Sequence, residues 1–359
     1  MCVYHSRDVR NGSQTGVADG GLSSDCSRNH LTIVCGCFAD LEVKILQGDV
    51  MKVATMATGG IGGFLAAHLI RTGHDVATIA RGAHLKSIET EGLTLVAAGI
   101  ETIERPWIAT ANPGDVGEVD VVIFAVKGGD LESAAKASLP LLGKKTVVVP
   151  FLNGVEAAER LTKILPPQNV ADGVAYVSTT VAKPGVIEQT GTFNRFVFGE
   201  RGNAASPRLD TLRHALNEAG IDAPFTDDID REIWAKFVLF SAVSGVTAAA
   251  RCRVSDIVGD AALGQLFRGV IAETAAIGRA RGVALPDEIE EETWKLATTL
   301  PGPMRASTAV DLEHGRPLEI EWISGAVARL SDAAGLDAPI NHTLYALLSP
   351  YRTGATRPS

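Results

Sequence analysis

The feature that most constrains the fold is a glycine-rich turn between an apolar run and a segment with helical spacing. Residues 52–56 are mostly apolar, residues 61–72 carry apolar residues at helical spacing, and residues 74–80 form a second apolar run. Strand, glycine-rich turn, helix and strand in this order are typical of the βαβ unit of a dinucleotide-binding domain. In such units the pyrophosphate lies at the helix N-terminus, where free N–H groups and the helix dipole favour negative charge. The turn itself is Ala57-Thr58-Gly59-Gly60-Ile61-Gly62.

Two residues of this unit bear on the identity of the cofactor. Ala57 stands where the first glycine is expected. Alanine resists positive φ, so either the turn avoids that conformation or cofactor binding is weakened. At the end of the second strand, where NAD enzymes place an acidic residue for the ribose, this chain has Arg81, which suits the 2′-phosphate of NADP(H). The alternative interpretation of Arg81 is a solvated loop arginine.

Two further polar residues follow expected buried strands. Lys127 comes just after the apolar run 119–126, and Asn153 comes after the run 145–151. Ligands of open parallel sheets bind at the carboxyl ends of the strands, so both side chains are candidates for contact with cofactor or substrate. The alternatives are a surface lysine and a simple Asn-Gly turn. The residues expected to bind the cofactor are Ala57, Thr58, Gly59, Gly60, Ile61, Gly62, Arg81, Lys127 and Asn153.

Strands and helices alternate as far as Asp227, which predicts a parallel sheet. The expected strands are residues 52–56, 74–80, 119–126, 145–151, 170–181, 186–189, 194–198 and 223–226, the later ones finishing the sheet. The expected helices between them are residues 61–72, 130–142, 155–165 and 208–219. After Asp227 only helical spacing remains, over residues 230–249, 261–281, 286–297 and 317–334. The sequence therefore predicts an α/β Rossmann-type N-terminal domain followed by an all-α C-terminal domain, with a cleft between them.

The first 50 residues differ from the rest of the chain. They are rich in Gly, Ser, Asn and Asp, and their aspartates do not fit a signal peptide. We expect residues 1–50 to be a disordered or mis-assigned extension, 51–227 a nucleotide-binding domain, 228–352 a helical substrate domain and 353–359 a tail. Four of the five cysteines fall in the first 37 residues, without the spacing of a zinc site. A chain of this size needs no disulfide framework, so we expect a reducing cytoplasm and no metal site.

Charge and hydropathy restrict the partners. The formal net charge of -9 argues against a nucleic-acid partner, because no basic stripe is available to neutralise phosphates. The longest apolar run, residues 237–250, is too short for a membrane span and is interrupted by Ser241, Ser244 and Gly245, so we expect a core helix. The expected partner is a small molecule. The sequence does not fix the oligomeric state, and a homodimer is one expectation that it leaves open.

Several separated motifs, taken together, resemble the ketopantoate reductase (2-dehydropantoate 2-reductase) family over Met51 to about Leu348. The motifs are Gly59-Gly-Ile-Gly62, Ile79-Ala-Arg81-Gly-Ala-His84-Leu85, Val126-Lys127, Asn153-Gly154, Ile233-Trp-Ala-Lys236-Phe and Gly315-Arg-Pro-Leu-Glu319-Ile. The resemblance implies a Rossmann domain joined to a helical domain. It also implies reduction of the ketone of 2-dehydropantoate with NADPH, a step towards pantothenate and coenzyme A.

The chemistry that the resemblance implies needs hydride delivery to carbon and a proton for the developing alkoxide. Lys236 interrupts one of the most apolar helical segments, and burial there would lower its pKa towards neutral pH. By resemblance it is the catalytic lysine; the alternative is a lysine that snorkels to the surface. Glu319 is aligned with Ile323 and Ala326 on one expected helical face, and by resemblance it binds substrate. Its alternative is a first-turn glutamate that complements the helix dipole.

Other substrate contacts follow from the resemblance, with two departures. Ser307 matches the family's carboxylate-binding serine, although a serine there also suits a helix cap. The family carries asparagines four and eight residues after the lysine, where this chain has Phe240 and Ser244. Phe240 cannot hydrogen-bond a hydroxyl, so the pocket is expected to be less polar. The expected substrate-binding residues are Asn153, Ser244, Ser307 and Glu319.

Three functions remain open from the sequence. The leading hypothesis is an NADPH-dependent ketopantoate reductase with Lys236 as general acid. The second is a related NADP-dependent reductase of another 2-oxo or 3-oxo acid, motivated by Phe240 and Ser244. The third is a non-catalytic NADP-binding sensor, motivated by Ala57. Function inferred from likeness alone is an association, so turnover of a substrate panel separates the three.

Overall fold

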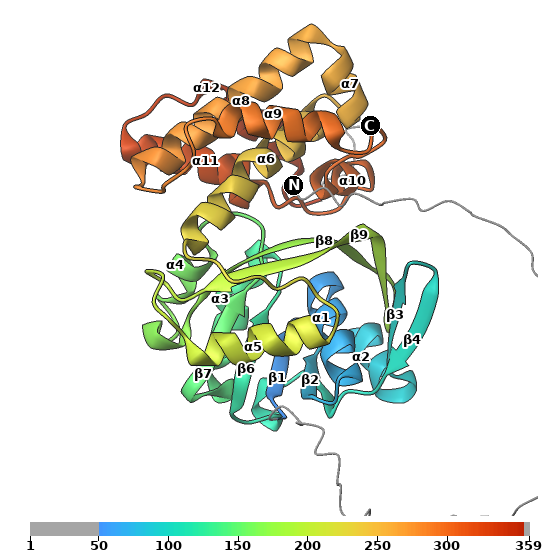
Figure 1. Ribbon diagram of the computed structural model, residues 1–359. Helices are drawn as coiled ribbons and strands as arrows, with labels where there is room; N and C mark the ends of the chain where they lie inside the picture. Colours follow the sequence, from blue (N-terminus) through green and yellow to red (C-terminus); the bar gives the residue numbers. More distant parts are fainter. Residues whose placement is uncertain (1–49, 355–359) are drawn as a thin grey trace, which may run out of the picture. The chain divides into compact units, whose positions relative to one another are not determined.

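The computed structural model of the chain describes residues 50–354. The predictions for residues 1–49 and for the last five residues of the expected tail lie outside this range. Within it, an α/β N-terminal half is followed by a helical C-terminal half, as predicted (Figure 1).

A five-stranded parallel sheet forms the base of the N-terminal half. Its order is β5 (Ile108–Thr110), β2 (Asp75–Ile79), β1 (Lys52–Met56), β6 (Val119–Phe124) and β7 (Leu142–Pro150). All four strand pairs are parallel. Because β1 is the central strand, the turn that leads from it into α1 (Gly60–Arg71) lies at the middle of the carboxyl edge, where ligands of such sheets bind.

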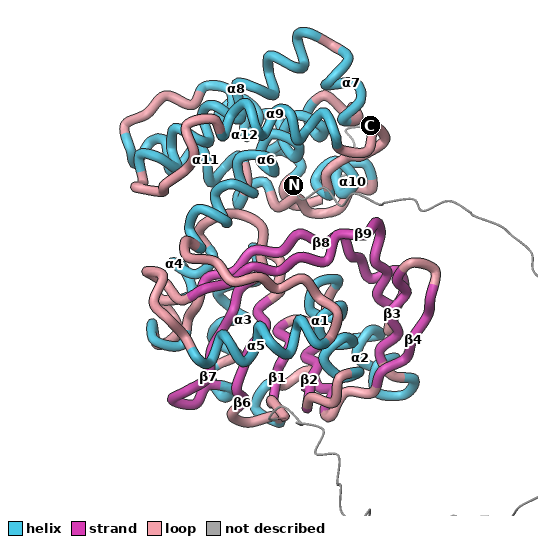
Figure 2. The backbone as a smooth tube through the Cα atoms, in the orientation of Figure 1, coloured by secondary structure: helices cyan, strands magenta, loops and turns pink. Residues whose placement is uncertain are grey.

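The later strands do not finish this sheet, which corrects the prediction. They form a second sheet in the order β4 (Ile100–Glu104), β3 (Leu93–Ala97), β9 (Val186–Gly199) and β8 (Asp172–Lys183). The runs 186–189 and 194–198 belong to the single strand β9. Its middle residues are mostly exposed, and the run Gln189-Thr-Gly-Thr192 interrupts the apolar pattern although the strand continues. Figure 2 shows the strands in these two groups.

Helix α1 lies between the two sheets and supplies much of their shared core (Figure 1). Phe64 of α1 stacks on Phe196 of β9, with ring centroids 6.0 Å apart, and Phe151 meets Phe196 edge to face at 5.2 Å. The other face of the parallel sheet is covered by the short helices α3 (Leu131–Ala137) and α4 (Ala157–Leu161). Both are shorter than predicted. The remaining helices of this half are α2 (Gly82–Glu91) and α5 (Pro207–Glu218).

The strand predicted over residues 223–226 is absent. The backbone N–H of Ala223 donates to the Asn217 side chain at 3.1 Å, and the Ala223 carbonyl accepts from the same side chain at 2.9 Å. Pro224 has no N–H to give to a neighbouring strand. With both backbone groups of Ala223 satisfied by an amide side chain, only an isolated bridge between Arg195 and Asp222 remains.

Helix α6 (Ile229–Ala249) is the centre of the C-terminal half and matches its prediction to one residue. Its first turns pack on the second sheet, where Ile229 and Ile233 meet Val174 and Tyr176, and its later turns enter the helical core. Among the described residues it is the one helix long and apolar enough to span a membrane, yet 67% of that window is buried in the fold. Around it lie α7 (Val254–Gly259), α8 (Ala261–Ala280), α9 (Ile289–Thr299), α10 (Ser307–Glu313), α11 (Ser324–Ala334) and α12 (Pro339–Leu348).

The helix predicted over residues 317–334 begins only at Ser324, so that prediction is wrong for its first two turns. Pro317 forms an isolated antiparallel bridge with Thr353, and the Leu318 N–H donates to the Arg352 carbonyl at 3.2 Å. This pairing holds the segment extended before a short 3-10 turn, Ile320–Trp322. Glu319 is therefore a loop residue and not a first-turn helical glutamate.

Candidate active site

The turn after β1 accommodates an alanine at position 57, where such turns usually have their first glycine. The backbone at Ala57 does not take a positive φ, so the first of the two alternatives holds and the turn avoids that conformation. Gly62 is required for a different reason, since a Cβ there would overlap the Ala57 carbonyl oxygen. The start of α1 thus lies directly against the turn, and no larger residue fits at position 62.

The same turn leaves room for a ligand. Gly59 is the N-cap of α1, and no side chain caps this end of the helix. A Cβ at Gly59 would meet nothing within 4 Å among the described residues, so the space beside this N-cap residue is open. An uncapped helix start in front of open space fits the pyrophosphate of a dinucleotide.

Two cations lie beside this edge in weak ion pairs. The Arg81 guanidinium is 82% exposed and lies 3.8 Å from the Asp130 carboxylate. Lys127 Nζ lies 3.5 Å from Asp311, a residue of α10. Exposed pairs of this length contribute little to stability, so an incoming phosphate could take either cation from its partner.

Lys236 projects from α6 between two aromatic rings. Its Nζ lies 3.3 Å from the Asn153 side-chain oxygen, 5.3 Å from the Phe240 ring centroid and 5.9 Å from the Tyr176 ring centroid. Burial lowers the pKa of Lys236 to about 8, and the negative charge of Glu319 opposes this shift. Burial likewise raises the pKa of Tyr176 to about 12, so the tyrosine stays neutral beside the ammonium. The lysine therefore reaches Asn153 instead of snorkelling into solvent.

Glu319 joins the helical half to the parallel sheet. One of its carboxylate oxygens accepts a hydrogen bond from the backbone N–H of Gly128 at 3.0 Å. Gly128 follows Lys127 at the carboxyl end of β6. The contact between Lys236 and Asn153 joins α6 to the end of β7. The contact between Glu319 and Gly128 joins the loop before α11 to the end of β6.

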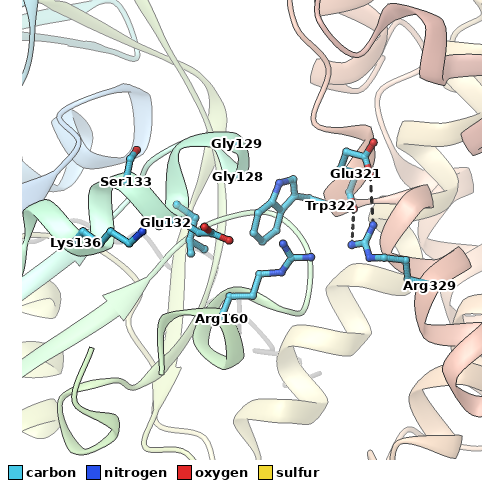
Figure 3. Close-up of a pocket in the computed structure, with 10 residues that line it drawn as sticks. Gly128, Gly129, Glu132, Ser133, Lys136, Arg160, Glu321, Trp322 and Arg329 are labelled. Carbon is cyan, nitrogen blue, oxygen red and sulfur yellow. Dashed lines mark hydrogen bonds and ion pairs between the residues drawn. The ribbon is translucent and has the colours of Figure 1, made fainter. Parts of the chain in front are cut away.

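Trp322 completes this junction (Figure 3). Its indole occupies the space that a Cβ at Gly128 would need, and its backbone oxygen lies 2.6 Å from a Cβ placed at Gly154. The Arg160 guanidinium stacks on the indole at 4.4 Å. A cavity of about 650 Å³ opens beside these groups, and Figure 3 shows the Arg329 side chain paired with Glu321 at its rim.

The two serines take different positions. The Ser244 hydroxyl is buried and hydrogen-bonds the buried Thr308 hydroxyl at 2.6 Å. Ser307, the neighbour of Thr308, is exposed and is the first residue of α10. Ala306 is the N-cap, so the alternative of a serine cap is wrong.

Sequence reasoning missed four residues that shape this region: His84, Tyr176, Thr308 and Trp322. His84 lies in the motif Ile79–Leu85, but one of its two contacts is to Gly185, in the turn between β8 and β9 of the second sheet. Tyr176 reaches Lys236 because α6 packs on β8, and no local sequence pattern predicts this packing. Trp322 lies two residues beyond the Gly315–Ile320 motif, and its fit against two glycines is visible only in three dimensions.

Comparison with known proteins identifies the family. The family model described as ketopantoate reductase PanE/ApbA matches residues 53–203, and its C-terminal counterpart matches residues 228–352. A 2-dehydropantoate 2-reductase from Mesorhizobium japonicum is 34% identical over 83% of this chain and 97% of its own length. The crystal structure of a PanE/ApbA family ketopantoate reductase from Ralstonia eutropha is 33% identical and aligns with a TM-score of 0.76 over 84% of this chain and 98% of that one. A 2-dehydropantoate 2-reductase structure from Methylococcus capsulatus is 26% identical and aligns with a TM-score of 0.77 over 86% and 99%. The chain is thus an oxidoreductase and belongs to the ketopantoate reductase family.

Proposed function

We propose that the protein reduces the ketone of 2-dehydropantoate to pantoate with NADPH, a step in pantothenate and coenzyme A biosynthesis. Lys236 is the general acid of this reaction. The observation that carries the proposal is the half-buried ammonium of Lys236, with a pKa of about 8, held 3.3 Å from Asn153, which follows β7 at the carboxyl edge of the parallel sheet. The reaction needs such a cation beside the ketone oxygen.

NADPH, when bound, would supply the hydride that reduces the carbonyl carbon. Backbone N–H groups of the turn and the α1 start would hold its pyrophosphate, and the exposed Arg81 would bind the 2′-phosphate that distinguishes NADPH from NADH. Lys127 and Asn153 follow β6 and β7 and would contact its ribose and nicotinamide side. The turn residues that take part are Ala57, Thr58, Gly59, Gly60, Ile61 and Gly62.

The protein's own part in the chemistry is to hold the ketone and protonate its oxygen. Lys236 Nζ donates a hydrogen bond to the ketone oxygen and gives up a proton as the alkoxide forms. A lysine with a pKa near 8 is still largely protonated at neutral pH, and it is a stronger acid than an ordinary lysine. The Asn153 oxygen accepts from Nζ and orients it. Glu319 and Ser307 would hold the hydroxyl and carboxylate of the substrate.

A second candidate is reduction of a 2-oxo acid with an apolar substituent. Phe240 and Tyr176 both face the ammonium that would bind the ketone, so apolar rings flank the place where the substituent lies. The Ser244 hydroxyl is engaged by Thr308 and would not be free for a substrate hydroxyl. The third hypothesis, a sensor without activity, was motivated by the need for a positive φ at Ala57, and the backbone there does not take a positive φ.

A substrate panel with both cofactors tests these proposals. Purified protein is given 2-dehydropantoate, branched aliphatic 2-oxo acids or phenylglyoxylate, with NADPH or NADH, and cofactor oxidation is followed by absorbance. The first proposal expects the highest kcat/KM for 2-dehydropantoate with NADPH. A higher value for the apolar acids would favour the second, and no turnover of any 2-oxo acid would refute both.

Two properties of the enzyme complete the proposal. We infer a cytoplasmic location from the cysteine usage of the chain, and a homodimer as the working assembly. Light scattering of the same preparation tests the assembly.

A further inference from the structure

The nucleotide turn is held by a histidine that lies outside it. The Thr58 carbonyl accepts a hydrogen bond from His84 Nε2 at 2.7 Å. The Thr58 N–H donates to the Ile79 carbonyl at 2.9 Å, and its hydroxyl bonds the Thr55 hydroxyl at 2.7 Å. Thr58 is 1% exposed, so its backbone and side-chain polar groups are all satisfied inside the protein. His84 belongs to the first turn of α2 and has no place in the parallel sheet.

The other ring nitrogen of His84 reaches the second sheet. His84 Nδ1 accepts a hydrogen bond from the Gly185 N–H at 2.9 Å. Because Nδ1 accepts, the ring proton sits on Nε2, which is the atom that donates to Thr58. Gly185 lies in the turn between β8 and β9, and its carbonyl accepts from the Thr94 N–H of β3 at 2.9 Å. One neutral imidazole therefore connects the nucleotide turn to a turn that is itself fixed to the second sheet.

The β8–β9 hairpin also fixes where α1 begins. A Cβ at Gly60 would lie 2.6 Å from the Thr179 backbone oxygen on β8. A Cβ at Gly63 would lie 2.6 Å from the Ile187 side chain on β9. These two glycines in the first turn of α1 are needed for packing within the chain. The second sheet thus braces the site that the first sheet provides.

The planar peptide between Thr58 and Gly59 links the His84 hydrogen bond to the proposed pyrophosphate site. The Thr58 carbonyl and the Gly59 N–H belong to one planar peptide unit, and in a trans peptide they point in opposite directions. With the carbonyl oxygen held by His84, the Gly59 N–H points away from α2, on the side of the turn opposite His84. Gly59 adjoins the open space in front of α1.

We infer that His84 is a positioning residue for cofactor binding, which aims the Gly59 N–H at the pyrophosphate by holding the Thr58 carbonyl. The inference rests on the proposed dinucleotide site. His84 does not touch the reacting atoms, so its loss changes the affinity for NADPH and leaves the chemical step intact. The second sheet, through this imidazole, is part of the nucleotide-binding apparatus.

Three substitutions at one position test the inference. In His84→Gln the amide nitrogen can take the place of Nε2 and still donate to Thr58, whereas in His84→Asn the amide reaches only the place of Nδ1. His84→Ala removes both contacts. The matched control is His74→Ala, because His74 Nδ1 also accepts a backbone N–H, from Met51 at 3.2 Å, at the opposite end of β1. NADPH affinity is measured by fluorescence titration, folding by thermal melting, and kcat at saturating NADPH.

The expected pattern separates positioning from general destabilisation. His84→Ala and His84→Asn should weaken NADPH binding about tenfold, the worth of one lost hydrogen bond, while His84→Gln stays within about threefold of wild type. His74→Ala should bind normally, and kcat at saturation should change less than about twofold in all four. Unchanged affinity in folded His84→Ala, or equal losses in the Gln and Asn variants, would overturn the inference. No NADPH binding by the wild type would refute the dinucleotide site itself, and the inference with it.

Discussion

The Glu319 carboxylate accepts a hydrogen bond from the backbone N–H of Gly128 at 3.0 Å, which ties the helical half of the chain to the edge of the parallel sheet. Three residues further along, Trp322 fills the space beside Gly128, so the contact leaves no room for a side chain there. The candidate site is therefore built from both halves of the chain. Its geometry depends on a close fit at one glycine as much as on the polar residues.

Substitution of that glycine should disturb the site at a distance from the chemistry. Gly128→Ala places a methyl group into the indole of Trp322, and overpacking of this kind costs about 1–3 kcal/mol. We expect a lower melting temperature and a lower kcat/KM, measured by thermal unfolding and steady-state kinetics. The control is Gly129→Ala, where an added Cβ meets nothing within 4 Å of the described residues. Equal effects of the two substitutions would contradict the role of the fit.

Arg81 should decide between the two nicotinamide cofactors. Its guanidinium is exposed and only loosely paired with Asp130, so it is available for a 2′-phosphate. Arg81→Ala should weaken NADPH binding about tenfold to a hundredfold, the worth of a charged hydrogen bond, and leave NADH binding unchanged. Titration with both cofactors gives the answer. An unchanged preference for NADPH would show that Arg81 is only a solvated loop arginine.

The pH dependence of the reaction should report Lys236. In the proposed mechanism ketone reduction requires the protonated ammonium, and burial lowers the pKa of this group from 10.5 to about 8. The kcat/KM for reduction should therefore be constant below pH 8 and fall about tenfold per pH unit above it, while oxidation of the alcohol shows the opposite trend. Lys236→Arg should reduce the ketone slowly, because arginine does not give up a proton, and the pH profile of its residual rate should lack the decline because arginine stays charged. A reduction profile that stays flat to pH 10 would be inconsistent with the lysine as acid.

Phe240 should control the polarity of the substrate pocket. Its ring lies 5.3 Å from Lys236 Nζ, within reach of the substituent on a bound ketone. Phe240→Asn supplies a hydrogen-bonding group, and it should raise kcat/KM for 2-dehydropantoate relative to an apolar 2-oxo acid by about tenfold. Phe240→Leu, which keeps an apolar side chain, should not. If both variants shift the ratio equally, the ring's volume and not its lack of polarity governs the choice.

Local sequence patterns correctly predicted the elements whose residues form a continuous apolar or helical pattern. The bounds of β1 match the prediction, and α6 differs from it by one residue, because each is a continuous apolar or helical pattern. The glycine-rich turn was also recognisable, since its residues form one contiguous motif. The reason why position 62 must be glycine was not recognisable, because the Ala57 carbonyl approaches it only in the folded turn.

Long-range contacts account for the errors. The sequence patterns of β8 and β9 do not say which sheet they join. Only the pairing of β9 with β3, and of β8 with β9, reveals that they leave the parallel sheet. The helix expected from Pro317 was replaced by an extended segment that pairs with Thr353 near the chain's end. Tyr176 joined the site for the same reason, through packing of β8 on α6.

The most direct test of the account is a single-turnover measurement with NADPH bound before 2-oxo acid is added. Lys236→Met keeps the length of the apolar stem and removes the ammonium, so NADPH should bind as it does to the wild type. The account predicts that reduction then slows by about 10²–10⁴-fold, the contribution of a general acid. Reduction by Lys236→Met within tenfold of the wild-type rate would contradict it.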